Sequence, residues 1–242
     1  RDVERGGIRG AKKIPLLMQC AARPAGDGSA HVVITLPNGQ EVSSRDANVD
    51  DLLSTTFGRP VLLQSLPTDG STEHFESGVP DNPDMMTEIR EIMGRDEDEP
   101  LPDFAVFPPV IFDFATPPGT HYDCWPLLVM STSALEAMQK AVPDSVVDIL
   151  RFRPSIMIDT PDEVGHPEFS WKGRKGQLGS AVIDFLDPCP RCVMITRQVT
   201  DDIPADRAIL RHVIRDLNQA VGIYASIVTP GKVSVGDTLT FL

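Results

Sequence analysis

The chain has 242 residues, of which 41% are hydrophobic and 24% charged, and its formal net charge is −13. This composition is typical of a globular protein with one large domain or two small ones. The negative charge argues against broad binding to nucleic acid or to an anionic membrane, and no apolar run of about 18 residues is present to predict a membrane span.

The four cysteines, at positions 20, 124, 189 and 192, are too few for a disulfide framework. We therefore expect reduced thiols and a cytoplasmic protein. No signal-peptide pattern opens the sequence. Because the chain begins with Arg1 rather than Met, an upstream targeting segment is equally compatible with the sequence.

The N-terminal part of the chain predicts short strands and one helix. Alternating apolar residues around an Asn-Gly turn predict a hairpin over residues 31–43. A helix is expected over 49–57, ended by Gly58. A further strand is expected over 60–66.

The amino-acid composition then changes over residues 67–109, which are rich in Pro, Asp, Glu, Gly and Ser. The four residues from 96 to 99 are all acidic. This composition favours a solvated, mobile insertion, with a short helix over 85–93. The functional alternative is a docking surface for a basic partner, such as an external redox protein.

The remaining sequence mixes strands with a few helices. A capping box at Ser133 predicts a helix that ends before Pro143, and apolar residues spaced by three and four predict another over 205–220. Together with many short strands, they favour a mixed fold around a closed or strongly curved sheet. The strands are expected over 152–159, 177–185 (interrupted near Gly179), 192–197 and 222–228, with a final hairpin over 232–242.

A pair of cysteines is the most informative chemical feature. Cys189 and Cys192 are three positions apart, with Arg191 beside the second. A thiolate is a soft metal ligand and a nucleophile, and a neighbouring cation favours its ionised form. Three interpretations of this pair stay open: half of a zinc site, a dithiol redox centre, or two structural thiols. Zinc lacks a second ligand pair, and the strand expected after the pair disfavours a redox centre.

Two other segments have groups that suit an anion. Arg151 and Arg153, two positions apart on an expected strand, would point to one face and clamp a phosphate. Ordinary surface charge is the alternative. The hydroxyls of residues 131–133 precede a helix, where anions bind well, although plain N-capping accounts for Ser133.

Taken in order, a series of segments resembles a MOSC domain, the domain found in molybdenum-cofactor sulfurases and amidoxime-reducing molybdoenzymes. The resemblance implies an α+β, mainly β fold, a MOSC-type β-barrel with a few flanking helices. The segments are 151–154, 171–173, 189–192, 222–225 and 230–237. The implied domains are a truncated MOSC N-terminal-like β region (1–66), the acidic insertion (67–110) and the MOSC domain (111–242).

The resemblance also implies roles for individual residues. Cys192 would be the thiolate ligand of molybdenum or a sulfur-carrying cysteine, and Cys189 a structural thiol. Arg153 and Arg191 would supply donors to the pterin or its phosphate. Ser155 stands where the reducing enzymes have an asparagine. The other implied cofactor-binding residues are Ser131, Thr132, Ser133 and Lys12.

The function implied by the resemblance is binding of the molybdenum cofactor (Mo-molybdopterin), with reduction of an N-hydroxylated small molecule as the leading hypothesis. Electrons would come from an external donor, because no haem, flavin or iron–sulfur motif is present. The alternatives are a sulfur-carrier or cofactor-handling module with a persulfide on Cys192, and a non-catalytic binding domain. Pyridoxal phosphate binding is a further label at the level of the family.

Overall fold

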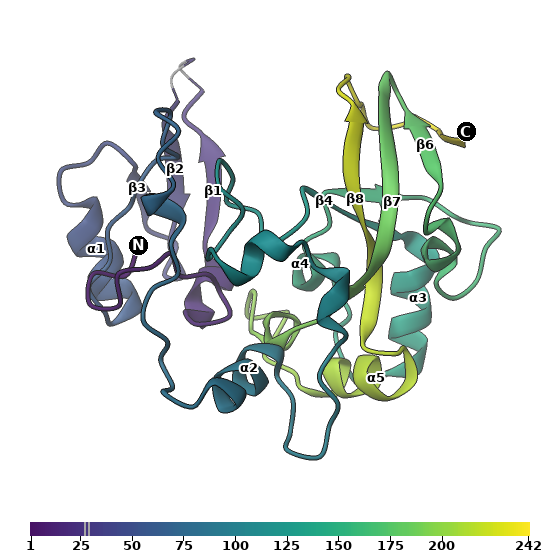
Figure 1. The fold of residues 1–242 in the computed structure, drawn as a ribbon, viewed down its shortest axis with the longest axis horizontal. Coiled ribbons are helices and arrows are strands. Elements are labelled where there is room, and N and C mark those ends of the chain that lie inside the picture. Colours follow the sequence, from purple (N-terminus) through teal and green to yellow (C-terminus); the bar gives the residue numbers. More distant parts are fainter. Residues whose placement is uncertain (27, 29) are drawn as a thin grey trace. The chain divides into compact units, whose positions relative to one another are not determined.

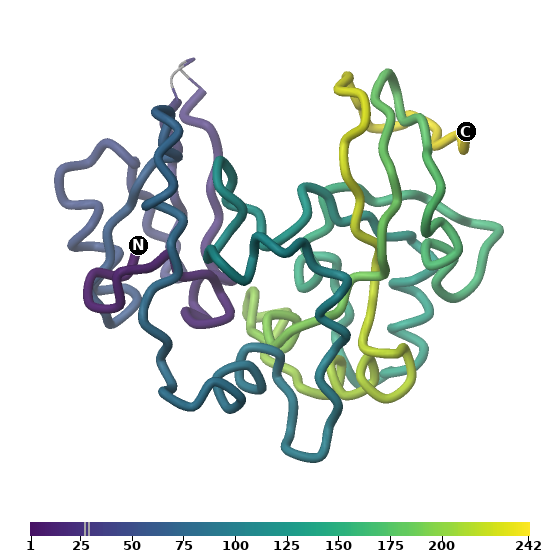
Figure 2. The backbone as a smooth tube through the Cα atoms, viewed as in Figure 1, coloured from purple at the N-terminus to yellow at the C-terminus, as the bar shows by residue number. Residues whose placement is uncertain are grey.

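The computed structural model describes residues 1–26, 28 and 30–242, which form two compact units (Figures 1 and 2). Each unit combines segments that are far apart in the sequence. Unit 1 comprises Arg1–Ile92, Pro109–Asp123 and Arg197–Pro204, and unit 2 comprises Met93–Pro108, Cys124–Thr196 and Ala205–Leu242. Within the described residues, no helix combines the length and apolar character that crossing a membrane requires.

Unit 1 is built on a three-stranded antiparallel sheet and helix α1. Strands β1 (Ala21–Pro24), β2 (Val32–Thr35) and β3 (Glu41–Ser43) pair in that order, which confirms the predicted hairpin. Helix α1 (Val49–Phe57) ends where predicted, because Gly58 takes the left-handed conformation with φ 65°. The buried core of the unit consists of Ile14, Leu36, Val42, Val49, Leu53 and Val61. The short 3-10 helices are η1 (Pro15–Gln19), η2 (Glu73–Phe75) and η4 (Pro109–Phe112).

The strand predicted over residues 60–66 is wrong. Only Val61 pairs, as an isolated bridge with Asp2. The leucines of this segment are exposed. A short apolar run is therefore not sufficient to form a strand here, since among the described residues no neighbouring strand pairs with it.

The segment over residues 67–110 contains short helices and a few buried side chains within a mostly exposed stretch, and its mobility stays a prediction. Helix α2 (Met85–Met93) has the predicted bounds. Glu88 of this helix lies 2.6 Å from Lys13, measured between Oε1 and Nζ. Phe75 is only 1% exposed. Buried contacts hold parts of a segment whose composition is that of a loop.

The acidic run from 96 to 99 finds its basic partner within unit 2. Asp96 accepts hydrogen bonds of 2.8 Å from both Arg207 and Arg211, and Glu99 also pairs with Arg211. Arg211 lies on helix α5 (Ala208–Asp216). These two carboxylates are thus paired, and a docking role for the rest of the acidic run stays a prediction.

Unit 2 contains a six-stranded sheet that curls into a half-barrel. Its order is β5-β4-β8-β7-β6-β9, and only the β4–β5 pair is parallel. The two long strands β7 and β8 run side by side (Figure 1). The strands are β4 (Leu127–Ser131), β5 (Ile156–Ile158), β6 (Lys175–Leu178), β7 (Ala181–Pro190), β8 (Ala220–Thr229) and β9 (Leu239–Phe241).

The curl follows from one apolar cluster that both edge strands share. Ile156 of β5 and Phe241 of β9 pack against the same buried group, which includes Phe185 and Trp171. The ring centroids of Trp171 and Phe241 lie 5.8 Å apart. Burying both edges against one core bends the sheet. The predicted α+β class with a curved, barrel-like sheet is confirmed.

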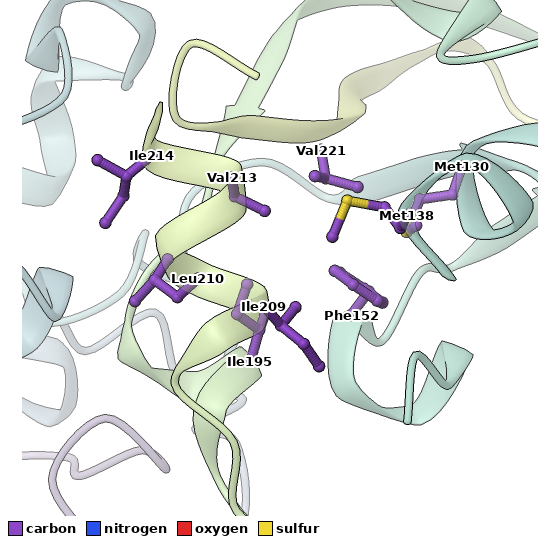
Figure 3. Close-up of a cluster of buried hydrophobic side chains, with 9 residues drawn as sticks. All are labelled: Met130, Met138, Phe152, Ile195, Ile209, Leu210, Val213, Ile214 and Val221. Carbon is purple, nitrogen blue, oxygen red and sulfur yellow. The ribbon is translucent and has the colours of Figure 1, made fainter. Parts of the chain in front are cut away.

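A second core joins the helices of unit 2 to the sheet (Figure 3). Helix α5 is shorter than the predicted range 205–220, but its apolar residues have the predicted spacing and are buried. They meet Met138 of helix α3 (Thr132–Ala141) and Phe152 of helix α4 (Ile149–Phe152). The short 3-10 helices are η3 (Phe104–Val106), η5 (Pro167–Trp171) and η6 (Val193–Thr196).

The start of helix α3 differs from the prediction by two residues. Ser131, not Ser133, is the N-cap, and its Oγ accepts a 3.1 Å hydrogen bond from the Ala134 amide. Ser131 still has extended backbone angles as the last residue of β4. The strand therefore runs directly into the helix, and Ser133 already belongs to its first turn.

Several predicted strands take other forms. The range 152–159 begins at the end of helix α4, because the Asp148 side chain caps that helix and Arg153 turns left-handed after it, and only β5 is a strand. The range 192–197 is 3-10 helical as η6. The final hairpin is wrong as well, because β9 pairs with β6.

The strand predicted over 177–185 is instead a hairpin of β6 and β7, and its turn is visible in Figure 2. Gly179 lies in this turn with φ 57°, and a Cβ there would lie 2.3 Å from the Lys232 carbonyl oxygen. The interruption expected near Gly179 is thus a full reversal of the chain.

Two histidines of unit 1 share a hydrogen bond. The Nε2 atoms of His74 and His121 are 3.0 Å apart, and a bridge between Glu76 and Phe114 joins the segments that carry them. Burial lowers the pKa of both rings, and His121 and Arg1 lower the pKa of His74 further. The pair is therefore neutral near pH 7, with one ring donating to the other.

We predict that this pair makes the stability of the protein depend on pH. Because both folded pKa values are lowered, the unfolded chain binds more protons below the usual histidine pKa of about 6.5, so stability is full above that pH and is lost as the pH falls. The double variant His74→Gln, His121→Gln should show a weaker loss. Thermal unfolding at a series of pH values measures this, and an unchanged pH dependence in the variant contradicts it.

Candidate functional site

The two thiols of the Cys-Pro-Arg-Cys segment lie where β7 leaves the sheet. The register of β7 on β8 is irregular on both sides of Pro188 and ends at Pro190. Proline donates no ladder hydrogen bond, and such bulges redirect a strand. Cys189 is therefore still on the strand, whereas Cys192 lies in the loop between β7 and η6.

Gly222 of β8 is needed beside this irregular region. It has φ 75°, and a Cβ there would lie 2.8 Å from the Met130 side chain and 3.0 Å from the Val129 carbonyl oxygen. Only glycine takes this conformation without strain at such close approach. Strand β8 therefore approaches β4 at this position as closely as only glycine permits.

The structure gives the two cysteines different surroundings. Cys189 is 4% exposed, and its sulfur lies 3.2 Å from Nη1 of Arg191. Burial raises the pKa of Cys189 even though Arg191 opposes the rise, so this group is a neutral thiol near pH 7. Cys192 is half-buried, and its sulfur has no hydrogen bond within the described residues. Cys192 is thus the thiol available to a ligand.

The Arg191 side chain is turned into the protein. It is 8% exposed, donates to Cys189, and donates to the Phe152 carbonyl at 2.9 Å. Its Nε is buried without a hydrogen-bond partner in the described structure. A buried N–H left unpaired is costly. One donor of Arg191 is therefore left unsatisfied inside the protein.

The predicted clamp of two arginines on one strand face is wrong. Arg151 belongs to helix α4 and is 1% exposed, and it donates to the carbonyls of Val146 at 2.8 Å and Ile195 at 3.3 Å. Arg153 follows with φ 54° and is exposed. No hydrogen bond or ion pair of its guanidinium occurs in the part of the chain that the structure describes. Arg153 is the arginine of this pair that can meet an anion.

Hydrogen bonds link the turn that carries Arg153 to the loop that carries Cys192 in both directions. Arg191 of the loop donates to Phe152 of the turn, and Arg151 of the turn donates to Ile195 of η6. The exposed cation and the half-buried thiol are therefore on two locally cross-linked segments.

The hydroxyls of residues 131–133 already have partners within unit 2. Ser131 is fully buried, and its Oγ lies 2.5 Å from Oε2 of the buried Glu168. Thr132 donates to Asp159 at 3.0 Å. Ser133 is also buried. Carboxylates beside these hydroxyls disfavour an anion, so their role in holding a phosphate stays a prediction.

The remaining candidates, Ser155 and Lys12, also have local partners. The Ser155 amide donates to the Leu128 carbonyl at 2.8 Å, and its Oγ accepts from the Leu128 amide at 3.3 Å, which extends the pairing of β4 with β5. Lys12 belongs to unit 1, where its Nζ lies 2.5 and 2.7 Å from the carboxylate oxygens of Asp123. Cofactor contacts from either residue are untested predictions.

Two residues around the thiols were not identified from the sequence. Tyr224 of β8 is 8% exposed, and burial together with the neighbouring thiols of Cys189 and Cys124 raises its pKa well above the usual value. Arg95 is 5% exposed and donates to the Arg191 carbonyl at 3.1 Å. The Tyr224 segment was part of the family resemblance, but no spacing signals a contact between Arg95 and a residue so distant in sequence.

A scan against protein families matches the MOSC domain over residues 117–240, just over half of the chain. The chain belongs to the MOSC domain family. This family is associated in general with binding of the molybdenum cofactor. No curated protein matches the chain.

Among solved structures, the MOSC chain is similar to YiiM from Escherichia coli, with 20% identity over 49% of this chain and 54% of that one and a TM-score of 0.37. A crystal structure described as a hypothetical protein has 21% identity over 48% of this chain and 51% of that one, with a TM-score of 0.36. The chain thus spans about half the length of these structures.

We predict different effects on stability for Arg191 and Arg153. Arg191→Met leaves the buried Phe152 carbonyl without its donor and should lower the free energy of unfolding by about 1–3 kcal/mol. Arg153→Met removes an exposed, unpaired guanidinium and should change it by less than about 0.5 kcal/mol. Urea unfolding of both variants measures this. Equal losses of unfolding free energy in the two variants would contradict the stabilising role of the buried Arg191 side chain.

Proposed function

We propose that this MOSC protein binds the molybdenum cofactor through Cys192, which serves as a thiolate ligand of the metal. The observation that carries the proposal is Cys192 itself, a half-buried residue whose sulfur has no hydrogen bond within the described residues, directly after the buried and hydrogen-bonded Arg191. A soft thiolate suits such a metal. Cys189 does not compete, because its buried thiol already contacts Arg191.

Arg153 supports an anionic ligand of this kind. Arg153 is exposed and has no partner in the described structure, so its guanidinium can bind the phosphate of the cofactor with charge-assisted hydrogen bonds. The donor set therefore fits a ligand with a soft metal at one point and an anionic group at another.

We infer that the reaction is the reduction of an N-hydroxylated compound. When bound, the cofactor supplies two-electron oxygen-atom transfer. Removing the oxygen of an N-hydroxyl group consumes two electrons and two protons and releases water. The sequence contains no haem, flavin or iron–sulfur motif, so the electrons come from an external donor. In this account Cys192 holds the metal and Arg153 orients the cofactor.

The metal content of purified protein tests the role of Cys192. Expressed in a host that makes the cofactor, the wild type should retain molybdenum together with pterin. Cys192→Ala should lose at least about nine-tenths of the metal, since a lost ligand costs far more than the 1.4 kcal/mol of a tenfold change. Cys20→Ala, a half-buried free thiol of unit 1, is the matched control and should retain it.

The outcomes separate the rival functions. Equal molybdenum in wild type and Cys192→Ala contradicts the ligand assignment. A labile extra sulfur atom on Cys192 by intact mass, without molybdenum, favours a sulfur carrier. Absence of metal, pterin and persulfide alike favours a non-catalytic binding domain. Full loading without turnover of any amidoxime by a chemical donor rejects the reductase activity while leaving cofactor binding in place.

A further inference from the structure

Residue 191 is held by a closed ring of hydrogen bonds. Its amide donates to the Gln219 carbonyl at 2.8 Å, and its own carbonyl accepts from Nη2 of Arg95 at 3.1 Å. Arg95 closes the ring, because its Nε and Nη2 lie 3.1 and 3.0 Å from Oε1 of Gln219. Both main-chain groups of the residue before Cys192 are therefore fixed.

The backbone of Gln219 is strained. It has φ 69°, and the preceding Asn218 has φ 47°. Side chains other than glycine rarely take this left-handed conformation, which persists where the surroundings impose it. The turn between α5 and β8 is a position where glycine is the ordinary choice. A glutamine where glycine is the ordinary choice indicates that the hydrogen bonds of its side chain are needed.

That side chain has two partners, one in the ring and one outside it. Oε1 accepts both hydrogen bonds from Arg95, and Nε2 donates to the Leu101 carbonyl at 3.3 Å. The Gln219 amide also donates to the Val213 carbonyl at 2.9 Å. Asn218, by contrast, is exposed, and the described structure has no hydrogen bond from its side chain. The two neighbours share the strain, and only Gln219 joins the ring.

Arg95 is a buried cation close to the thiol loop. Its third donor, Nη1, bonds the Met93 carbonyl. Burial lowers its pKa to about 10 despite Glu99, so it stays charged near pH 7, and its charge interacts with Cys192 as well as with Arg211. Burying a cation is costly unless its donors are used. All of the donors named here are used on the ring or on the segment that brings Arg95 to it.

We propose that Gln219 and Arg95 are positioning residues that fix the Cys192 sulfur in the orientation its ligand requires. The carbonyl of residue 191 and the amide of residue 192 belong to one planar peptide that ends at the Cys192 Cα. Holding that carbonyl and the preceding amide therefore sets where the Cys192 side chain begins. The purpose of this ring rests on the proposed function of Cys192, whereas its effect on the sulfur is measurable without metal.

Glycine variants at the two strained positions separate positioning from simple stability. Gln219→Gly relieves the backbone strain and opens the ring by removing the acceptor of Arg95, whereas Asn218→Gly relieves the same kind of strain and leaves the ring intact. Gln219→Glu keeps an acceptor for Arg95. Arg95→Lys breaks the ring from the other side while keeping the charge. The readouts are the melting temperature, the alkylation rate of Cys192 at one fixed pH in metal-free protein relative to Cys20, and the dissociation rate of molybdenum from loaded protein.

Asn218→Gly should melt at or above the wild-type temperature, whereas Gln219→Gly should melt at or below it, because the strain it relieves is offset by the donors of buried Arg95 that lose their acceptor. Only Gln219→Gly and Arg95→Lys should alkylate faster at Cys192 and release molybdenum faster, by about three- to tenfold, which corresponds to one lost hydrogen bond. Gln219→Glu should stay near wild type. If Gln219→Gly is too unstable to measure, Arg95→Lys takes its place. Faster alkylation of Cys192 in Arg95→Lys than in Gln219→Glu then supports the positioning role, and equal rates contradict it.

Matching alkylation rates for Gln219→Gly and Asn218→Gly would overturn the positioning role. A wild type that never holds molybdenum, but in which Gln219→Gly still accelerates alkylation of Cys192, rejects the proposed cofactor function and leaves the positioning role standing.

Discussion

The main chain at residue 191 is the constraint on which the thiol site depends. Its amide and carbonyl are bonded to Gln219 and Arg95, and its side chain reaches Phe152 beside the Arg153 turn. Each hydrogen bond contributes only about 1 kcal/mol net, yet a buried group left without its partner costs more than that. Losing one of these hydrogen bonds therefore weakens the others. Together they hold the main chain directly before the half-buried Cys192.

The geometry also distinguishes the interpretations that the Cys-Pro-Arg-Cys spacing leaves open. Cys189 is buried against Arg191, which makes it a structural thiol in this structure. Among the described residues, no group of three or more His, Cys, Asp and Glu side chains is arranged to hold a metal ion, so a zinc site from protein ligands is not assembled. A 3-10 helix, not the expected strand, follows Cys192, so the objection to a redox pair that rested on that strand no longer applies.

Features with a local cause were predictable from the sequence. Helix α1 ends at a left-handed glycine, and the apolar spacing of helix α5 matches its buried face. Contacts between distant residues were not predictable. Arg151 looked like a surface cation on a strand, yet its guanidinium is buried against the Ile195 carbonyl. Arg95 lies in a segment whose composition suggested disorder, and only the fold brings it to Arg191. The thiol of Cys192 was selected from the sequence because soft-ligand chemistry is local to the motif, and its role as a ligand stays a prediction.

X-ray absorption at the molybdenum edge is the most direct test of the central claim, that the Cys192 sulfur is the protein's ligand to the metal. The number of sulfur atoms bound to molybdenum is compared between cofactor-loaded wild type and Cys192→Ser. The account predicts one sulfur fewer in the variant, with an oxygen or nitrogen in its place. The same sulfur count in both proteins would contradict it.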